Sequence, residues 1–178
     1  MEQDRRRYRL VRLLTGGVTP LALAAALLAF ARWHDPAWEA GAQAAGICRE
    51  LVAGTTEGRQ ALFGSCWVAP LPVLVYLPFA WLLPEPAAGW GVFFAAWLFA
   101  FWAVREAVKA IGQSAWRIVL AQGAIAAAAA FSGLPTAFEA ATALVVGLLL
   151  VAAAGVADWA AYGRLRDVVS AGTAAALL

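Results

Sequence analysis

Two carboxylates that could take part in chemistry follow the first long apolar run of the sequence. Asp35 and Glu39 are four positions apart and come soon after the uncharged segment 13–31. Partial desolvation at a membrane boundary makes a carboxylate more basic and strengthens its attraction for a cation. Both residues are therefore candidates for a general base or for metal ligands, and their oxygens suit Mg²⁺ or Mn²⁺ better than zinc. The alternative is that they only solvate a loop.

Few other reactive groups accompany these carboxylates. His34 is the single histidine, so a histidine metal cluster or a Ser-His-Asp triad cannot be assembled within this chain. Cys48 and Cys66 either form a disulfide, if their side of the membrane is oxidising, or remain two free thiols. The sequence contains neither a glycine-rich phosphate loop nor a nucleotide fingerprint. Any chemistry in water is expected in the polar segment 32–66.

Composition places the chain among membrane proteins. Of its 178 residues, 63% are hydrophobic and 13% are charged, against roughly 25% charged in soluble domains. Uncharged runs of 18 or more residues, long enough to cross a bilayer as helices, are 13–31, 60–84, 86–104, 118–138 and 140–157. We therefore expect an all-α, polytopic transmembrane helix bundle with about five spans, a partial sixth, and one transmembrane domain over 1–178.

Two further segments qualify this expectation. In the first external loop, 32–66, polar and apolar residues alternate with helical periodicity over 38–52, which predicts an amphipathic helix on the membrane surface. After Asp167 the chain has eleven uncharged residues, about half a span. This tail either lies along a neighbouring helix or marks the chain as the front portion of a longer protein, and we favour the second interpretation.

Basic residues predict the orientation. The arginines of the first twelve residues indicate a cytoplasmic N-terminus, and the composition favours a bacterial inner membrane. A net charge of +2 is too small to favour a nucleic-acid partner. Strict alternation of spans then places the basic loops 105–117 and 158–167 outside, against the positive-inside rule. A re-entrant pair of helices or a half-span between 67 and 104 would reverse both loops and remove this conflict.

The apolar runs themselves contain little that could carry charge. They include no Asp, Glu, Lys or Arg, which disfavours an ion channel or a charge-coupled transporter. Gln122 is their most polar side chain, and we expect it to bond a neighbouring helix. The dense aromatic residues of 90–102 predict contacts with another protein or with lipid tails.

The order of these features resembles the front of the polyprenyl-phosphate-dependent glycosyltransferases of the GT-C superfamily. A basic N-terminus, one span, a loop that opens with Asp35 and Glu39, and a second span that begins Pro70-Leu71-Pro72 carry the resemblance, as does Gly133-Leu134-Pro135 before Glu139. It covers roughly 5–167, although enzymes of the family are usually longer and have more spans.

The resemblance implies sugar transfer from a lipid-phosphate donor on the outer face. Asp35 or Glu39 would deprotonate the acceptor or hold a divalent ion, and Arg49 or Arg59 would pair with the donor phosphate. The expected partners are membrane lipids, a lipid-phosphate-linked sugar and other membrane subunits. The alternative function is that of a non-catalytic, multi-pass membrane subunit or scaffold.

Overall fold

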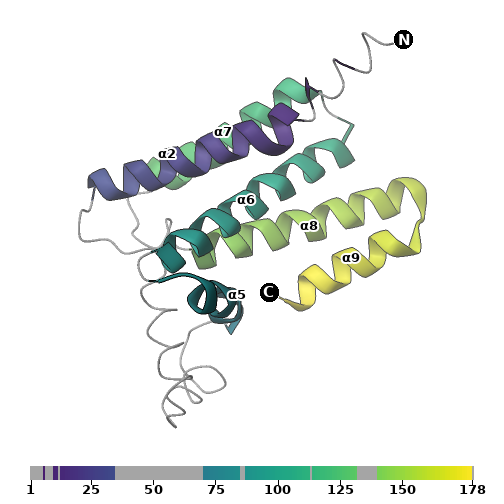
Figure 1. Ribbon diagram of the computed structural model, residues 1–178. Helices are drawn as coiled ribbons and strands as arrows, with labels where there is room; N and C mark the ends of the chain where they lie inside the picture. Colours follow the sequence, from purple (N-terminus) through teal and green to yellow (C-terminus); the bar gives the residue numbers. More distant parts are fainter. Residues whose placement is uncertain are drawn as a thin grey trace.

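The structure of the protein is a computed structural model that describes residues 6, 10–11, 13–34, 70–84, 87–112, 114–131 and 140–177 (Figure 1). Within these ranges every regular element is helical, as the composition predicts. The elements are η1 (Leu14–Val18), α2 (Thr19–His34), α5 (Pro70–Leu82), α6 (Ala87–Ala110), α7 (Ala115–Phe131), α8 (Ala140–Tyr162) and α9 (Leu165–Ala176). The predicted surface helix at 38–52 lies outside the described residues.

Three described segments are long and apolar enough to cross a membrane, which indicates a membrane protein. They are Leu14–Trp33, Ala87–Ala110 and Thr142–Tyr162. The predicted count of five spans and a partial sixth is not confirmed, because α7 has 17 residues and α5 has only 13. Helix α9, with 12 residues, has the half-span length expected for the tail.

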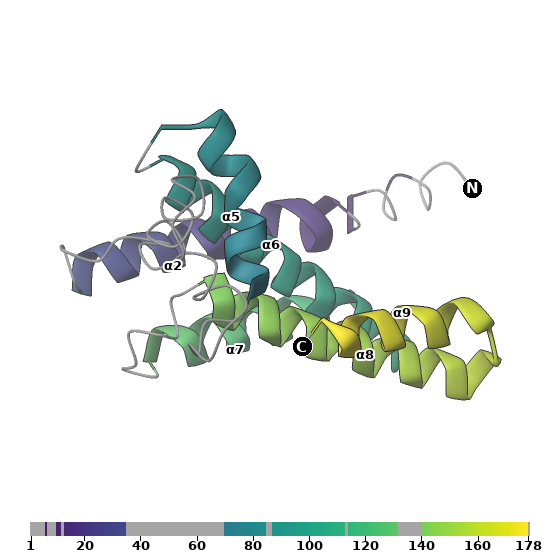
Figure 2. The same cartoon turned by 90° about the horizontal axis from the view of Figure 1, so that it is seen from below.

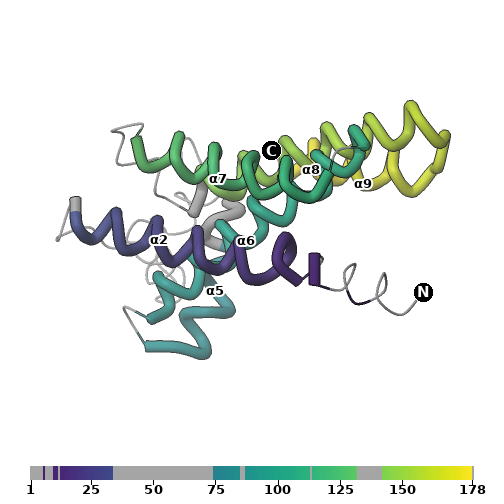
Figure 3. The backbone as a smooth tube through the Cα atoms, turned by 90° about the horizontal axis from the view of Figure 1, so that it is seen from above, coloured from purple at the N-terminus to yellow at the C-terminus, as the bar shows by residue number. Residues whose placement is uncertain are grey.

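The long helices alternate in direction and gather the basic side chains at one end. Helix α6 runs opposite to α2 and α7, and α8 runs parallel to α6 before α9 turns back along it (Figures 1 and 3). The N-terminal side of η1, the α6–α7 connection and the α8–α9 turn therefore share one end of the molecule. We call it the basic end, because it carries Arg105, Lys109, Arg117, Arg164 and Arg166.

Helix α5 follows α2 and precedes α6 in the chain. Its first turn carries two prolines, and Pro78 interrupts its interior, so it is short for a span. It lies across α6 near the start of that helix (Figure 2). Helix α2 ends and α6 begins at the same end of the molecule, opposite to the basic end. The half-span considered from the sequence remains a prediction.

Helix α6 forms the centre of the core. Phe93, Trp97 and Phe101 are spaced four residues apart on one face of α6, and each is at most 1% exposed. The ring centroids of Phe93 and Trp97 are 6.4 Å apart, and those of Trp97 and Phe101 are 5.6 Å apart. These aromatic residues of 90–102 are therefore buried within the chain itself. Trp90 and Trp102 remain exposed, as the prediction of outside contacts requires.

Two glycines terminate the helices at the basic end. Gly112 and Gly163 have φ angles of +71° and +64°, the left-handed region that glycine adopts without a steric penalty. The Gly163 N–H donates to Trp159 O at 2.7 Å, and the Gly112 N–H donates to Lys109 O at 2.8 Å. Helix α6 thus extends past Arg105, and α8 extends past Asp158, the charged residues at which the uncharged runs of the sequence end.

Candidate functional site

The site residues predicted from the sequence lie in a part of the chain that the structure leaves undescribed. These residues are Asp35, Glu39, Arg49, Arg59, Cys48 and Cys66. Their roles in catalysis, phosphate binding, Mg²⁺ or Mn²⁺ binding and disulfide formation remain predictions. The backbone of α2 ends at His34, directly before Asp35 and opposite to the basic end (Figure 1). Among the described residues, no three His, Cys, Asp or Glu side chains lie close enough together to hold a metal ion.

A buried amide joins three helical elements near the basic end. Gln122 of α7 is fully buried, and its Nε2 atom donates to Phe101 O at 2.9 Å and to Thr15 O at 3.1 Å. Both N–H groups of the amide are therefore bonded to backbone oxygens of other helices. This contact, which we call the Gln122 junction, confirms the expectation that Gln122 bonds a neighbouring helix. No described donor reaches its Oε1 atom.

The backbone of η1 accounts for the free oxygen that Gln122 binds. In this π-helical turn the Thr19 N–H donates to Leu14 O, five residues back, and not to Thr15 O. The next residue, Pro20, has no N–H to offer. Thr15 O consequently lacks a donor from either residue that would normally supply one. Because an unpaired buried carbonyl is costly, the Gln122 amide stabilises this turn as well as the packing of α7.

Arg105 extends the Gln122 junction toward the basic end. Its Nε lies 3.4 Å from Thr15 Oγ1, while that hydroxyl donates to Val11 O at 2.9 Å. The Arg105 guanidinium also contacts Glu106 Oε1 at 2.6 Å, and Lys109 Nζ contacts the same oxygen at 3.0 Å. The Arg105 side chain is 12% exposed and that of Glu106 is 33% exposed, so the ion pair is open to solvent on the side of Glu106.

A second region, the α8–α9 hairpin, is held by close contact between small residues. A Cβ atom on Gly155 would lie 2.8 Å from Asp167 O and 2.9 Å from Ala171 Cβ, so only glycine allows this approach. Asp167 is buried at the start of α9, and its Oδ1 accepts a hydrogen bond from Arg166 Nε at 3.3 Å. Small residues at helix interfaces are typical of membrane proteins.

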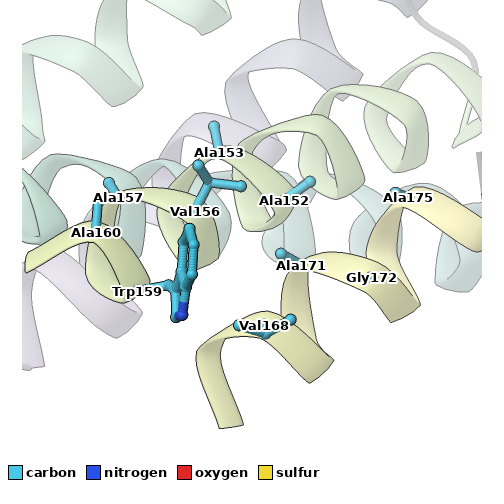
Figure 4. A pocket seen from close by; sticks show the side chains of 10 residues that line it. All are labelled: Ala152, Ala153, Val156, Ala157, Trp159, Ala160, Val168, Ala171, Gly172 and Ala175. Carbon is cyan, nitrogen blue, oxygen red and sulfur yellow. The ribbon is translucent and has the colours of Figure 1, made fainter. Parts of the chain in front are cut away.

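An apolar groove of about 800 Å³ runs along this hairpin (Figure 4). Helix α8 supplies Trp159, Val156 and several alanines, and α9 supplies Val168, Gly172 and two alanines. The residues that line it are Ala152, Ala153, Val156, Ala157, Trp159, Ala160, Val168, Ala171, Gly172 and Ala175. Neither a charged side chain nor a nucleophile lines it, so the groove is suited to binding an apolar group. The sequence analysis missed it because α8 is apolar on all sides.

The described residues thus offer one polar junction that holds helices together and one apolar groove. The sequence predicted that Gln122 bonds a neighbouring helix but not which one, whereas the groove depends on how α9 folds back. Comparison with known proteins found no family model, no curated protein and no solved structure that matches this chain.

Proposed function

We propose that this protein is a non-catalytic, multi-pass subunit of a bacterial inner membrane, inserted with its N-terminus in the cytoplasm. The observation that carries the proposal is the Gln122 junction. Gln122 is the one buried polar side chain among the described residues with no exposed surface, and it uses both N–H groups to hold η1 and α6 against α7. Such use of a polar side chain at membrane depth serves helix packing.

The distribution of charge supports the orientation. Apart from Arg32 at the far end of α2, the described basic residues that follow η1 all belong to the basic end. The positive-inside rule assigns an end of this kind to the cytoplasm. Trp33 and Trp90 at one end, with Trp116 and Trp159 at the other, are exposed and have the side chains typical of the two membrane interfaces.

The uncovered faces of the spans support a role within an assembly. In the apolar stretch of each candidate span, the share of residues that are buried is 56% for α6. It is only 28% for the η1–α2 segment and 33% for α8. Leu21, Leu120 and Leu149, on three different helices, are each more than half exposed. These apolar surfaces are available to lipid tails and to other membrane subunits.

The assembly role is tested by photo-crosslinking in cells. A crosslinking amino acid at Leu21, Leu120 or Leu149 should give one protein adduct of constant mass at the position that faces the partner. Lipid adducts alone at all three positions would contradict the subunit role.

The orientation is tested separately by Trp33→Cys and Gly112→Cys in a Cys48→Ser, Cys66→Ser background. An impermeant thiol reagent should label the first variant in intact cells and the second only after lysis.

A second candidate is the GT-C-like sugar transferase. The observation that favours it is the position of His34, since the polar segment that opens with Asp35 starts at the end opposite to the basic end. In the proposed orientation this is the outer face, where the lipid-phosphate donor would be used. Replacing Asp35 with Asn and Glu39 with Gln should abolish sugar transfer while insertion is retained. Unchanged transfer in the double variant would exclude this candidate.

A further inference from the structure

In the membrane placement proposed above, the groove between α8 and α9 opens onto the layer that lipid tails occupy. It is lined by Ala, Val, Gly and Trp residues of two helices whose connecting turn lies at the basic end (Figure 4). Among the described residues, α9 packs closely only on α8, so neither α2 nor α7 covers the groove. A groove of this kind within a bilayer is filled by whatever apolar group fits it.

The dimensions favour a lipid chain over a transmembrane helix. From Ala152 to Ala160 the groove follows roughly 12 Å of α8, at about 1.5 Å per residue. A third helix is itself about 10–12 Å wide and would contact the groove over little more than two turns. A single acyl chain is narrower and can follow the groove along its length.

Apolar contact alone cannot select one lipid from the bilayer, because all lipid tails are similarly apolar. Selection must come from the headgroup, and charge at the α8–α9 turn provides it. Arg164 stacks on Tyr162 with its Cζ 4.8 Å from the ring centroid. Stacking uses the face of the guanidinium, so its N–H edge remains available to phosphate oxygens.

Neighbouring charges leave the turn attractive to an anion. The Arg166 side chain is 73% exposed, and its Nε contacts Oδ1 of the buried Asp167 carboxylate at 3.3 Å. Asp158 belongs to the side of α8 opposite the groove-lining positions, since successive helical residues are rotated by about 100°. Trp159 lies in the groove near the turn, where tryptophan is typical of the membrane interface.

We propose that the α8–α9 groove binds an acyl chain of an anionic phospholipid whose phosphate pairs with Arg164 and Arg166. The groove holds the tail, and the two arginines select the headgroup. This site goes beyond the proposed subunit role, and its detection does not depend on the orientation of the protein in the membrane.

Photoreactive lipids test the proposal. The full chain is reconstituted in phosphatidylcholine vesicles that contain a trace of phosphatidylglycerol or phosphatidylcholine with a diazirine in one acyl chain. Peptide mapping should show that the phosphatidylglycerol probe labels α8 and α9 more strongly than the phosphatidylcholine probe does. Removing each arginine, as Arg164→Gln or Arg166→Gln, should lower this preference by roughly fivefold. Arg117→Gln, at the same end but on α7, serves as the matched control and should leave it unchanged.

A pair of glycine substitutions distinguishes lipid binding in the groove from attraction of the lipid by surface charge. Gly172→Leu fills the groove, and a Cβ at Gly172 meets nothing within 4 Å, so the hairpin should remain folded. Gly123→Leu on α7 is equally open and lies away from the groove. Labelling of α8 and α9 should fall severalfold in the first variant only. Equal labelling by the two lipids in the wild type, or unchanged labelling in Gly172→Leu, would overturn the proposal.

Discussion

The protein contains two helical regions that are stabilised in different ways. In the block of η1, α2, α6 and α7, side-chain hydrogen bonds to backbone oxygens join helices around a buried aromatic core. In the α8–α9 hairpin, and where α8 meets α6, close approach at glycines takes their place. The first region should therefore respond to loss of hydrogen bonds, and the second to gain of volume.

The largest expected effect is in the hairpin. Gly155→Leu should destabilise the protein by about 3 kcal/mol, since the added side chain meets Asp167 O at a distance that only backbone movement can relieve. Thermal unfolding in detergent measures this. Gly172→Leu is the matched control, because it adds the same side chain to the same hairpin in open space. Equal melting temperatures for the two variants would show that close packing does not hold α9.

A smaller effect of the same kind is expected between α6 and α8. A Cβ atom at Gly147 would lie 2.6 Å from the ring of Phe99 and 3.3 Å from Ala100 Cα. The ring can rotate aside at some cost, so Gly147→Ala should destabilise the protein by about 1–2 kcal/mol. The same unfolding assay applies, with Gly123→Ala as the control. If Gly147→Ala were as stable as the control, the two helices would not approach as closely as described.

The block responds to loss of polar contacts. Gln122→Leu should cost about 1–2 kcal/mol, the range for two hydrogen bonds between membrane helices. The cost should shrink in a Pro20→Ala background, because the restored N–H can supply Thr15 O in place of Gln122. A double-mutant cycle measures this coupling. Additive effects of the two substitutions would indicate that Gln122 does not compensate for Pro20.

The smallest effect is expected for the ion pairs at the basic end. Glu106→Gln removes the shared partner of Arg105 and Lys109, yet the Glu106 side chain is one-third exposed. Solvent screening limits such pairs to roughly 0.5 kcal/mol. The loss should diminish further at high salt. A loss of stability that persists at high salt would contradict this expectation and show that the ion pairs of Glu106 contribute substantially to the stability of the block.

Most helices of the protein were predictable from the sequence, but the way in which they pack on one another was not. Charge-free length predicted α6 and α8, and the lone amide in an apolar run predicted the contact of Gln122. Parallel packing of α6 on α8 could not be inferred, because a helix that is apolar on all sides gives no signal of which face is buried. The tail was expected to be half a span, and the structure shows that α9 lies along α8.

The candidate catalytic residues contrast with this outcome. Asp35 and Glu39 are candidates because they follow a span, and the first long described range ends at His34, one position before Asp35. The resemblance to the GT-C superfamily rests on short motifs, of which only the backbone of Pro70-Leu71-Pro72 is described, as the first turn of α5. Side-chain type and spacing identified candidates, while their proximity depends on folding that spacing does not encode.

The short length of α5 has a consequence for the order of biogenesis. The ends of a half-length helix carry backbone groups that hydrocarbon cannot satisfy, so α5 needs protein around it before it enters the bilayer. Its chief neighbour, α6, is synthesised after it, which delays that cover by a time on the order of seconds. In the proposed membrane protein, α5 would therefore stay at the membrane surface or within the insertion machinery until α6 has been synthesised, and the two helices would insert together.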